Sequence, residues 1–170
     1  MKGQKRLWVK NMKIKIMSRH AVEKYTETPM NEKTAIISIT DFGLDFAFLK
    51  NQPDYLYQVA FDDVDNDVIV DELGKKATEE DRIRVEVKYN MFSEEQAKAV
   101  AEFYFSVCNK IDCLICQCEH GQSRSAAMAA AIIEFRSRKG IKIFTDDRYY
   151  PNKVVFRKLL TALQNREPSV

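Results

Sequence analysis

Residues 112–137 read DCLICQCEHGQSRSAAMAAAIIEFRS. An apolar run ends at Cys118, a polar loop with one glycine follows, and an Ala-rich stretch begins after Ser123. The short apolar run predicts a buried strand, and the Ala-rich stretch predicts a helix that runs to Ser137, with Gly140 just beyond it as a terminator. Strand, tight loop and helix in this order are typical of α/β proteins.

The rest of the chain continues this alternation of strands and helices. Apolar, β-branched runs predict three more buried strands, at residues 12–17, 34–40 and 55–61. Helices are predicted at residues 18–25, at residues 93–109 and from Pro151 to about residue 165. We therefore expect an α/β fold with a central, mostly parallel sheet of four to five strands flanked by helices. Ligands of such sheets bind beyond the carboxyl ends of the strands, and Cys118 ends its strand there.

We expect one domain over residues 1–170, because the length suits a single core and no flexible linker is visible. Residues 64–91 are highly charged, except that Ile83, Val85 and Val87 alternate with charged residues. This pattern predicts a surface insertion with one edge strand. A lid over the site, a partner surface and a solvated elaboration all remain open as its role.

The overall charge excludes some partners. The 27 basic and 25 acidic side chains nearly cancel, so there is no general attraction to nucleic acid or to an anionic membrane. Residues 1–17 mix basic and apolar residues and do not resemble a signal peptide. The longest apolar run, residues 126–133, is far shorter than the roughly 18 residues of a membrane span. We expect a soluble, cytoplasmic protein.

All four cysteines lie within eleven positions, unlike the dispersed pairs of a disulfide-stapled secreted domain: Cys108, Cys113, Cys116 and Cys118. Reduced thiols are therefore expected. Cys113 and Cys116 have the spacing of zinc ligands, but no second Cys or His pair follows, so neither a metal nor another cofactor is expected.

Cys118 and Arg124 have the spacing of a phosphate-handling cysteine site. A thiol reacts as the thiolate, which the N–H groups at a helix N-terminus and a facing arginine favour. Gly121 lets the loop curl so that its amides turn inward around phosphate oxygens, and the Arg124 guanidinium can bind two of those oxygens. The predicted phosphate-binding residues are Glu119, His120, Gly121, Gln122, Ser123 and Arg124. Ser125 can hydrogen-bond the sulfur, or it is an ordinary first-turn serine.

With these residues the chain resembles the cysteine-dependent protein tyrosine phosphatase superfamily, whose loop reads His-Cys-x-x-Gly-x-x-Arg-Ser/Thr. The similarity is greatest to the small dual-specificity phosphatases of bacterial or phage type, and it covers residues 12–165. It implies a phosphatase-like fold, with Cys118 as nucleophile and Ser125 assisting the sulfur as leaving group. Gln117 stands where the family has the histidine that helps to hold the loop and favour the thiolate. His120, inside the loop, is interpreted as facing solvent rather than substrate.

The mechanism also requires a general acid, and three aspartates follow the strand at residues 55–61. The family carries its acid two residues after a bulky residue, so we predict Asp63, with Asp62 and Asp65 as the second and third choices. The alternative is that these aspartates only terminate the strand. Glu86 is a more remote candidate.

The expected function is hydrolysis of phosphomonoesters through a cysteinyl-phosphate intermediate. The acidic Glu119 disfavours highly charged ligands, so the expected substrate is phosphotyrosine, phosphoserine or phosphothreonine on a protein, or a small phosphomonoester. One alternative is a catalytically weak module that binds phosphoproteins. A sulfurtransferase or arsenate reductase is a weaker one, since small arsenate reductases carry the motif near the N-terminus. Oligomeric state stays open. Pairing of Cys118 with Cys116 or Cys113 under oxidation is a further hypothesis.

Overall fold

The computed structural model describes residues 11–166, and the expectation about the N-terminal segment lies largely outside them. The elements are β1 (Lys13–Ser18), α1 (Arg19–Tyr25), β2 (Thr34–Thr40), β3 (Tyr55–Ala60), α2 (Asn66–Leu73), α3 (Glu79–Lys88), α4 (Glu94–Val107), β4 (Cys113–Cys118), α5 (Arg124–Ser137), α6 (Ile141–Phe144) and α7 (Lys153–Gln164). The predicted strands at residues 12–17, 34–40, 55–61 and 112–118 match the observed ones within one residue at each end.

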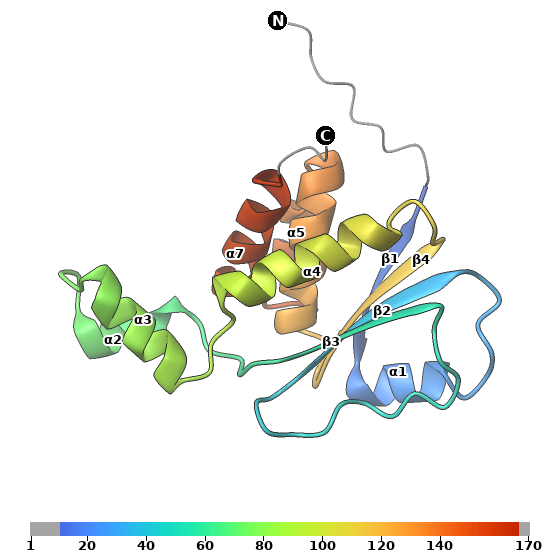
Figure 1. Cartoon of the computed structure of the whole chain (residues 1–170), viewed down its shortest axis with the longest axis horizontal. Helices are drawn as coiled ribbons and strands as arrows, with labels where there is room; N and C mark the ends of the chain where they lie inside the picture. Colours follow the sequence, from blue (N-terminus) through green and yellow to red (C-terminus); the bar gives the residue numbers. More distant parts are fainter. Residues whose placement is uncertain (1–10, 167–170) are drawn as a thin grey trace, which may run out of the picture.

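The four strands form one parallel sheet in the order β1-β4-β2-β3. Helices α4, α5 and α7 cover one face, and α1 lies on the other (Figure 1). Every residue of the two central strands, β2 and β4, is buried, because helices cover both faces of the sheet there. The predicted α/β fold with a parallel sheet flanked by helices is thus confirmed.

Local signals set several helix starts. Ser18 caps α1 by accepting a hydrogen bond from the Ala21 N–H, and Ser93 forms the expected capping box with Gln96 at the start of α4. The end of α5 differs from expectation, because Arg138 adopts the left-handed conformation there with φ of 59°. Gly140 serves another purpose: a Cβ at this position would lie 2.5 Å from the Ala130 carbonyl oxygen.

Two more predicted details of the helices are wrong. Pro151 precedes α7 instead of standing in its first turn, and the Asn152 side chain caps the helix by accepting from the Val155 N–H. Helix α4 ends at Val107, two residues earlier than expected.

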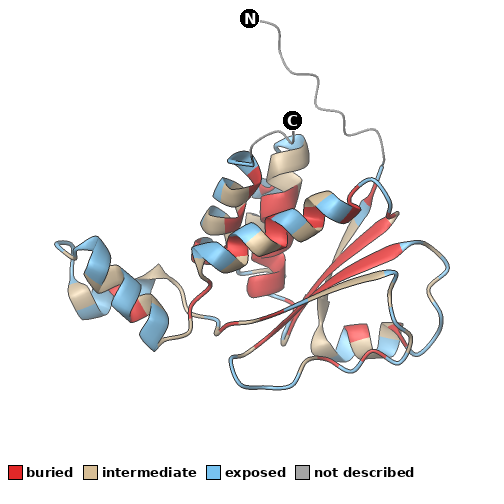
Figure 2. Cartoon of the chain, viewed as in Figure 1, coloured by how far each residue is buried: buried red, intermediate tan, exposed pale blue. Residues whose placement is uncertain are grey.

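The predicted edge strand within residues 64–91 is wrong, because the segment folds into the helices α2 and α3. Thr78 and Asp81 form a capping box that starts α3, a local signal that the alternating pattern masked. In a helix, Val85 points away from Ile83 and Val87, and it packs instead with Ile69, Met91 and Val154. Helices α2 and α3 lie to one side of the sheet, with largely exposed outer faces (Figure 2).

Within residues 11–166, none of the helices is both long enough and apolar enough to span a membrane.

Candidate active site

The loop between β4 and α5 lies at the carboxyl end of the sheet, against the start of α1. The Arg19 N–H donates to the Glu119 carbonyl oxygen at 3.1 Å, which ties the loop to the end of β1. Gly121 has φ of 67°, and a Cβ there would lie 2.5 Å from Ser18 N and 2.7 Å from the Met17 carbonyl carbon. The loop therefore reaches this position only with glycine.

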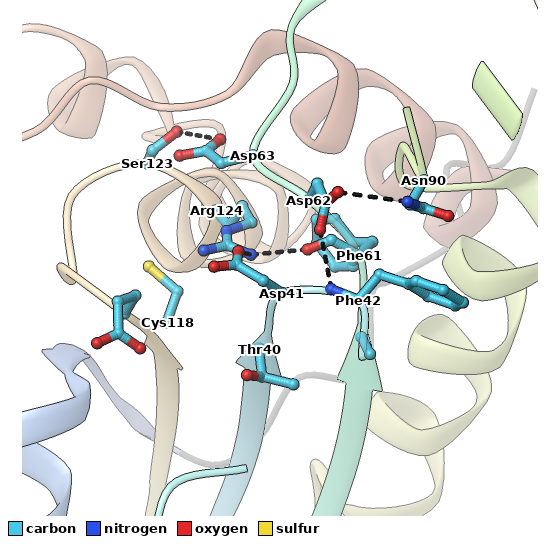
Figure 3. A network of polar contacts seen from close by, with 12 residues as sticks. Thr40, Asp41, Phe42, Phe61, Asp62, Asp63, Asn90, Cys118, Ser123 and Arg124 are labelled. Carbon is cyan, nitrogen blue, oxygen red and sulfur yellow. Dashed lines mark hydrogen bonds and ion pairs between the residues drawn. The ribbon is translucent and has the colours of Figure 1, made fainter. Parts of the chain in front are cut away.

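Cys118 ends β4 with its side chain enclosed by the loop. The residue is 2% exposed, and its Sγ lies 3.0 Å from the Ser125 Oγ in the first turn of α5. Figure 3 shows the Cys118 side chain and the guanidinium of Arg124 near one another at the carboxyl end of the sheet. The thiol thus lies at the N-terminus of a 14-residue helix whose first residue is Arg124.

Arg124 is held by one nitrogen and leaves another without a partner. Its Nη1 donates to the Asp41 Oδ1 at 2.6 Å and to the Phe61 carbonyl oxygen at 2.7 Å. Its Nε is buried and has no hydrogen-bond partner among the described residues. A buried, unpaired N–H of a cation is costly unless an anion occupies the site, so the guanidinium is anchored on one edge and prepared to bind on the other.

Asp41 is a site residue that sequence reasoning missed. It directly follows β2, which pairs with β4, so the carboxyl ends of the two strands lie side by side. The same rule that placed Cys118 at this edge applies to Asp41 and was a usable signal. Asp41 supplies the negative charge that compensates Arg124, and its side chain is 40% exposed.

Of the three aspartates after β3, Asp63 contacts the loop. Its Oδ1 accepts hydrogen bonds from the Ser123 Oγ at 2.8 Å and from the Asn152 Nδ2 at 3.0 Å. These contacts hold the carboxylate beside the residue that precedes Arg124, as Figure 3 shows.

The other acidic candidates have different partners. Asp62 accepts from the Phe42 N–H at 2.8 Å and points away from Cys118 (Figure 3). Asp65 caps α2 and also accepts from the Lys153 N–H. Glu86 lies on α3, not on an exposed strand, and pairs with Lys158 at 2.8 Å.

Arg19, which no sequence signal identified, neutralises the acidic side chain of the loop. Its Nε donates to the Glu119 Oε2 at 2.7 Å, and its Nη2 donates to the Thr40 Oγ1 and the Asp45 carbonyl oxygen. The loop is thereby joined to the end of β2. His120 and Gln122 are exposed, in keeping with the solvent-facing interpretation of His120.

Gln117 is fully buried and bound to the neighbouring strand. Its Oε1 accepts from the Ser38 Oγ at 2.6 Å, whereas its Nε2 has no partner among residues 11–166. Close by, burial and the neighbouring cysteines raise the pKa of the Cys116 thiol. A thiol that resists ionisation is a poor partner for thiol–disulfide exchange, which weighs against the oxidation hypothesis.

The site thus consists of a buried cysteine and a buried arginine in a glycine-containing loop, at the carboxyl edge of the parallel sheet. No group of three His, Cys, Asp or Glu side chains suited to a metal ion occurs within residues 11–166.

No protein-family model and no curated protein matches the chain. A solved structure that resembles it is the crystal structure of human DUSP28, with 14% sequence identity and a TM-score of 0.46. The alignment covers 89% of this chain and 91% of that one. At this identity and TM-score the likeness says nothing about activity.

Proposed function

We propose that the chain is a phosphatase that hydrolyses phosphomonoesters through a cysteinyl-phosphate intermediate. The observation that carries the proposal is the Arg124 Nε, a buried donor without a partner, in a loop that also encloses the Cys118 thiol. An anion at the mouth of this loop meets a nucleophile, an arginine and the N-terminus of α5 together.

The first step transfers the phosphoryl group to sulfur. The Cys118 thiolate attacks phosphorus, so that an S–P bond forms and the bond from phosphorus to the leaving oxygen breaks. Arg124 and the loop amides stabilise the equatorial oxygens as their charge redistributes. Asp63, held at the loop by Ser123 and Asn152, gives its proton to the leaving oxygen.

The second step returns the enzyme to its starting state. Asp63, now ionised, takes a proton from water as the water oxygen attacks phosphorus. The S–P bond breaks, inorganic phosphate leaves, and the electron pair returns to the Cys118 sulfur. A hydrogen bond from the Ser125 hydroxyl, 3.0 Å away, stabilises the thiolate as it leaves.

The proposed substrates are phosphorylated tyrosine, serine or threonine side chains of proteins. Among the loop side chains, Glu119 is already paired with Arg19, and no lysine is present to attract a polyanion such as an inositol polyphosphate. We also propose a cytoplasmic location, since the mechanism requires a reduced Cys118.

Hydrolysis of p-nitrophenyl phosphate at about pH 6 tests the proposal. Cys118→Ser and Arg124→Ala are each expected to lower kcat by at least about 10³-fold, because each removes a group essential to the transfer. Cys108→Ser is the matched control: it removes a buried thiol whose Sγ contacts the Phe105 carbonyl oxygen, away from the loop. Equal activity of Cys118→Ser and wild type contradicts the proposal.

The role of Asp63 is separable from that of Asp41 by the leaving group. Loss of a general acid slows poor leaving groups most, so Asp63→Asn should reduce hydrolysis of phenyl phosphate by about 10²-fold or more, with a smaller effect on p-nitrophenyl phosphate. Asp41→Asn removes the negative charge that compensates Arg124 and should slow both substrates alike. The reverse pattern would assign the acid to Asp41.

A second candidate function is a phosphoprotein-binding module with poor turnover. Gln117 favours it, because it stands where the phosphatases that the chain resembles have a histidine that favours the thiolate. Its amide oxygen accepts a hydrogen bond from Ser38 on β2. Tight binding of vanadate by the purified protein, with no phosphate released from p-nitrophenyl phosphate, would support the binding module over the enzyme. The Asp63→Asn variant also distinguishes a phosphatase from a sulfurtransferase, because the activity of a sulfurtransferase would survive this substitution.

A further inference from the structure

A surface groove begins where the candidate active site ends. Asp41 pairs with Arg124, and the next residue, Phe42, has a side chain that is 63% exposed. Asp62 joins the two regions, because it accepts from the Phe42 N–H while its own N–H donates to the Asn90 carbonyl oxygen. In Figure 3 the Phe42 ring lies on the Asn90 side, away from Cys118.

The groove has a volume of about 490 Å³ and lies between the 41–44 loop, α3 and the start of α4. Three large apolar side chains from two separate segments line it and are exposed: Phe42 at 63%, Ile83 at 51% and Val87 at 72%. Exposed apolar residues are common singly, but three that converge on one groove are typical of a binding surface.

The charged side chains that line the groove are acidic, whereas the chain as a whole has a net charge of +2. Glu79, Glu94 and Glu95 line it, and none of them has an ion pair among the described residues. A fourth glutamate, Glu86, is paired with Lys158 from outside the groove. Among residues 11–166, no lysine or arginine lines this groove.

We propose that this groove binds the polypeptide that carries the phosphorylated residue, through apolar and Lys or Arg side chains next to that residue. The inference rests on the proposed phosphatase function and specifies its substrate. Apolar side chains of the substrate pack on Phe42 and Val87, and its cations lie opposite Glu94 and Glu95. Because Phe42 adjoins Asp41, about 3.8 Å away along the backbone, one chain can reach both the groove and Arg124.

The same observations give the α2–α3 insertion a purpose. Two of the three apolar residues, Ile83 and Val87, belong to α3 and are four positions apart on one face of that helix. Val85 makes the buried contact of α3, which leaves Ile83 and Val87 exposed. The insertion thus contributes a substrate-facing surface beside the sheet.

The test compares two synthetic phosphotyrosine peptides, one flanked by Leu and Lys and the other by Ser and Asp. Binding is measured by fluorescence anisotropy on Cys118→Ser protein, which reports affinity whether or not the wild type turns over. The Leu/Lys peptide should bind at least about tenfold more tightly, a difference that one apolar contact and one charge pair readily provide. This preference should shrink as salt is raised.

Matched variants locate the effect. Val87→Ser, which removes an apolar contact without adding charge, should reduce the preference, whereas Val70→Ser, on the exposed surface of α2, should not. Phe42→Ala should weaken binding of the Leu/Lys peptide, whereas Phe48→Ala, also exposed but outside the groove, should not. Glu95→Gln should reduce the salt dependence, whereas Glu80→Gln, in the first turn of α3 but outside the groove, should not.

The two proposals fail in different ways. No hydrolysis of p-nitrophenyl phosphate by wild type overturns the phosphatase. Hydrolysis with equal affinity for the two peptides, or a preference unchanged by Val87→Ser and Phe42→Ala, overturns the groove as the peptide site. Equal binding of the unphosphorylated Leu/Lys peptide would show that the groove acts separately from the active site, and it also overturns the inference. A concentration-dependent dimer that Val87→Ser abolishes overturns it as well.

Discussion

Replacing Gly121 with alanine perturbs the loop at the point where it lies closest to β1. The positive φ of 67° costs an alanine about 1–2 kcal/mol. The new Cβ would also lie 2.5 Å from Ser18 N, about 1 Å closer than a normal contact. Both the Ser18 and Met17 atoms in its way belong to the backbone, so the clash is relieved only when the loop itself moves.

That movement predicts a large loss of activity. The loop amides must shift by about 1 Å, and misplacement of catalytic groups by this distance costs about 10²-fold in rate. We expect Gly121→Ala to lower kcat/KM for p-nitrophenyl phosphate by about that factor and to weaken vanadate binding. The strain should also lower Tm by about 2–4 °C for each kcal/mol lost.

Gly74→Ala is the control, measured by the same assays. Gly74 has φ of 68°, but a Cβ there meets nothing within 4 Å. With ψ of −174° its conformation is available almost only to glycine, so alanine costs about 1–3 kcal/mol there without a clash. Gly74→Ala should lose stability and keep its activity. If Gly121→Ala binds vanadate and turns over as wild type does, the close approach does not shape the site and our reasoning about the loop is refuted.

Three further predictions follow from the contacts around the loop. Ser125→Ala should slow breakdown of the intermediate by about tenfold or more, seen as a larger burst relative to the steady state, because the leaving sulfur loses its hydrogen bond. Arg19→Lys should lower Tm and weaken vanadate binding, since lysine lacks the two separate nitrogens, Nε and Nη2, by which Arg19 reaches Glu119 on one side and Thr40 and Asp45 on the other; an unchanged variant would show that these contacts are dispensable. Burial raises the pKa of the Cys116 thiol, so the folded state keeps a proton that the unfolded chain loses above about pH 9, and the free energy of unfolding should fall above that pH by about 1.4 kcal/mol per unit. Urea denaturation should show this slope to be smaller in Cys116→Ser.

The features that sequence alone predicted are those whose causes lie within a few residues. The four strands are short, largely apolar runs, and the capping residues Ser18 and Ser93 mark helix starts through contacts three positions away. The loop from Cys118 to Arg124 could be predicted for the same reason. Its glycine stands at a defined position between the strand and the helix.

The insertion shows where local pattern is ambiguous. Ile83, Val85 and Val87 alternate as strand residues do, yet they form a helix whose buried side holds Val85. The choice depended on the capping box of Thr78 and on apolar contacts with α2 and α7, which a period-of-two pattern does not reveal.

The sequence by itself determined the parallel α/β architecture and the cysteine, glycine and arginine of the loop, because these depend on neighbours along the chain. Only the tertiary structure decided which distant side chains meet them, and it also decided the close approach of Gly121 to the Ser18 and Met17 backbone. Asp41 reaches Arg124 across 83 positions, and Arg19 reaches Glu119 across 100. Strand order brings such residues together. It is set by the burial of the whole sheet, so it cannot be read from any single segment of the sequence.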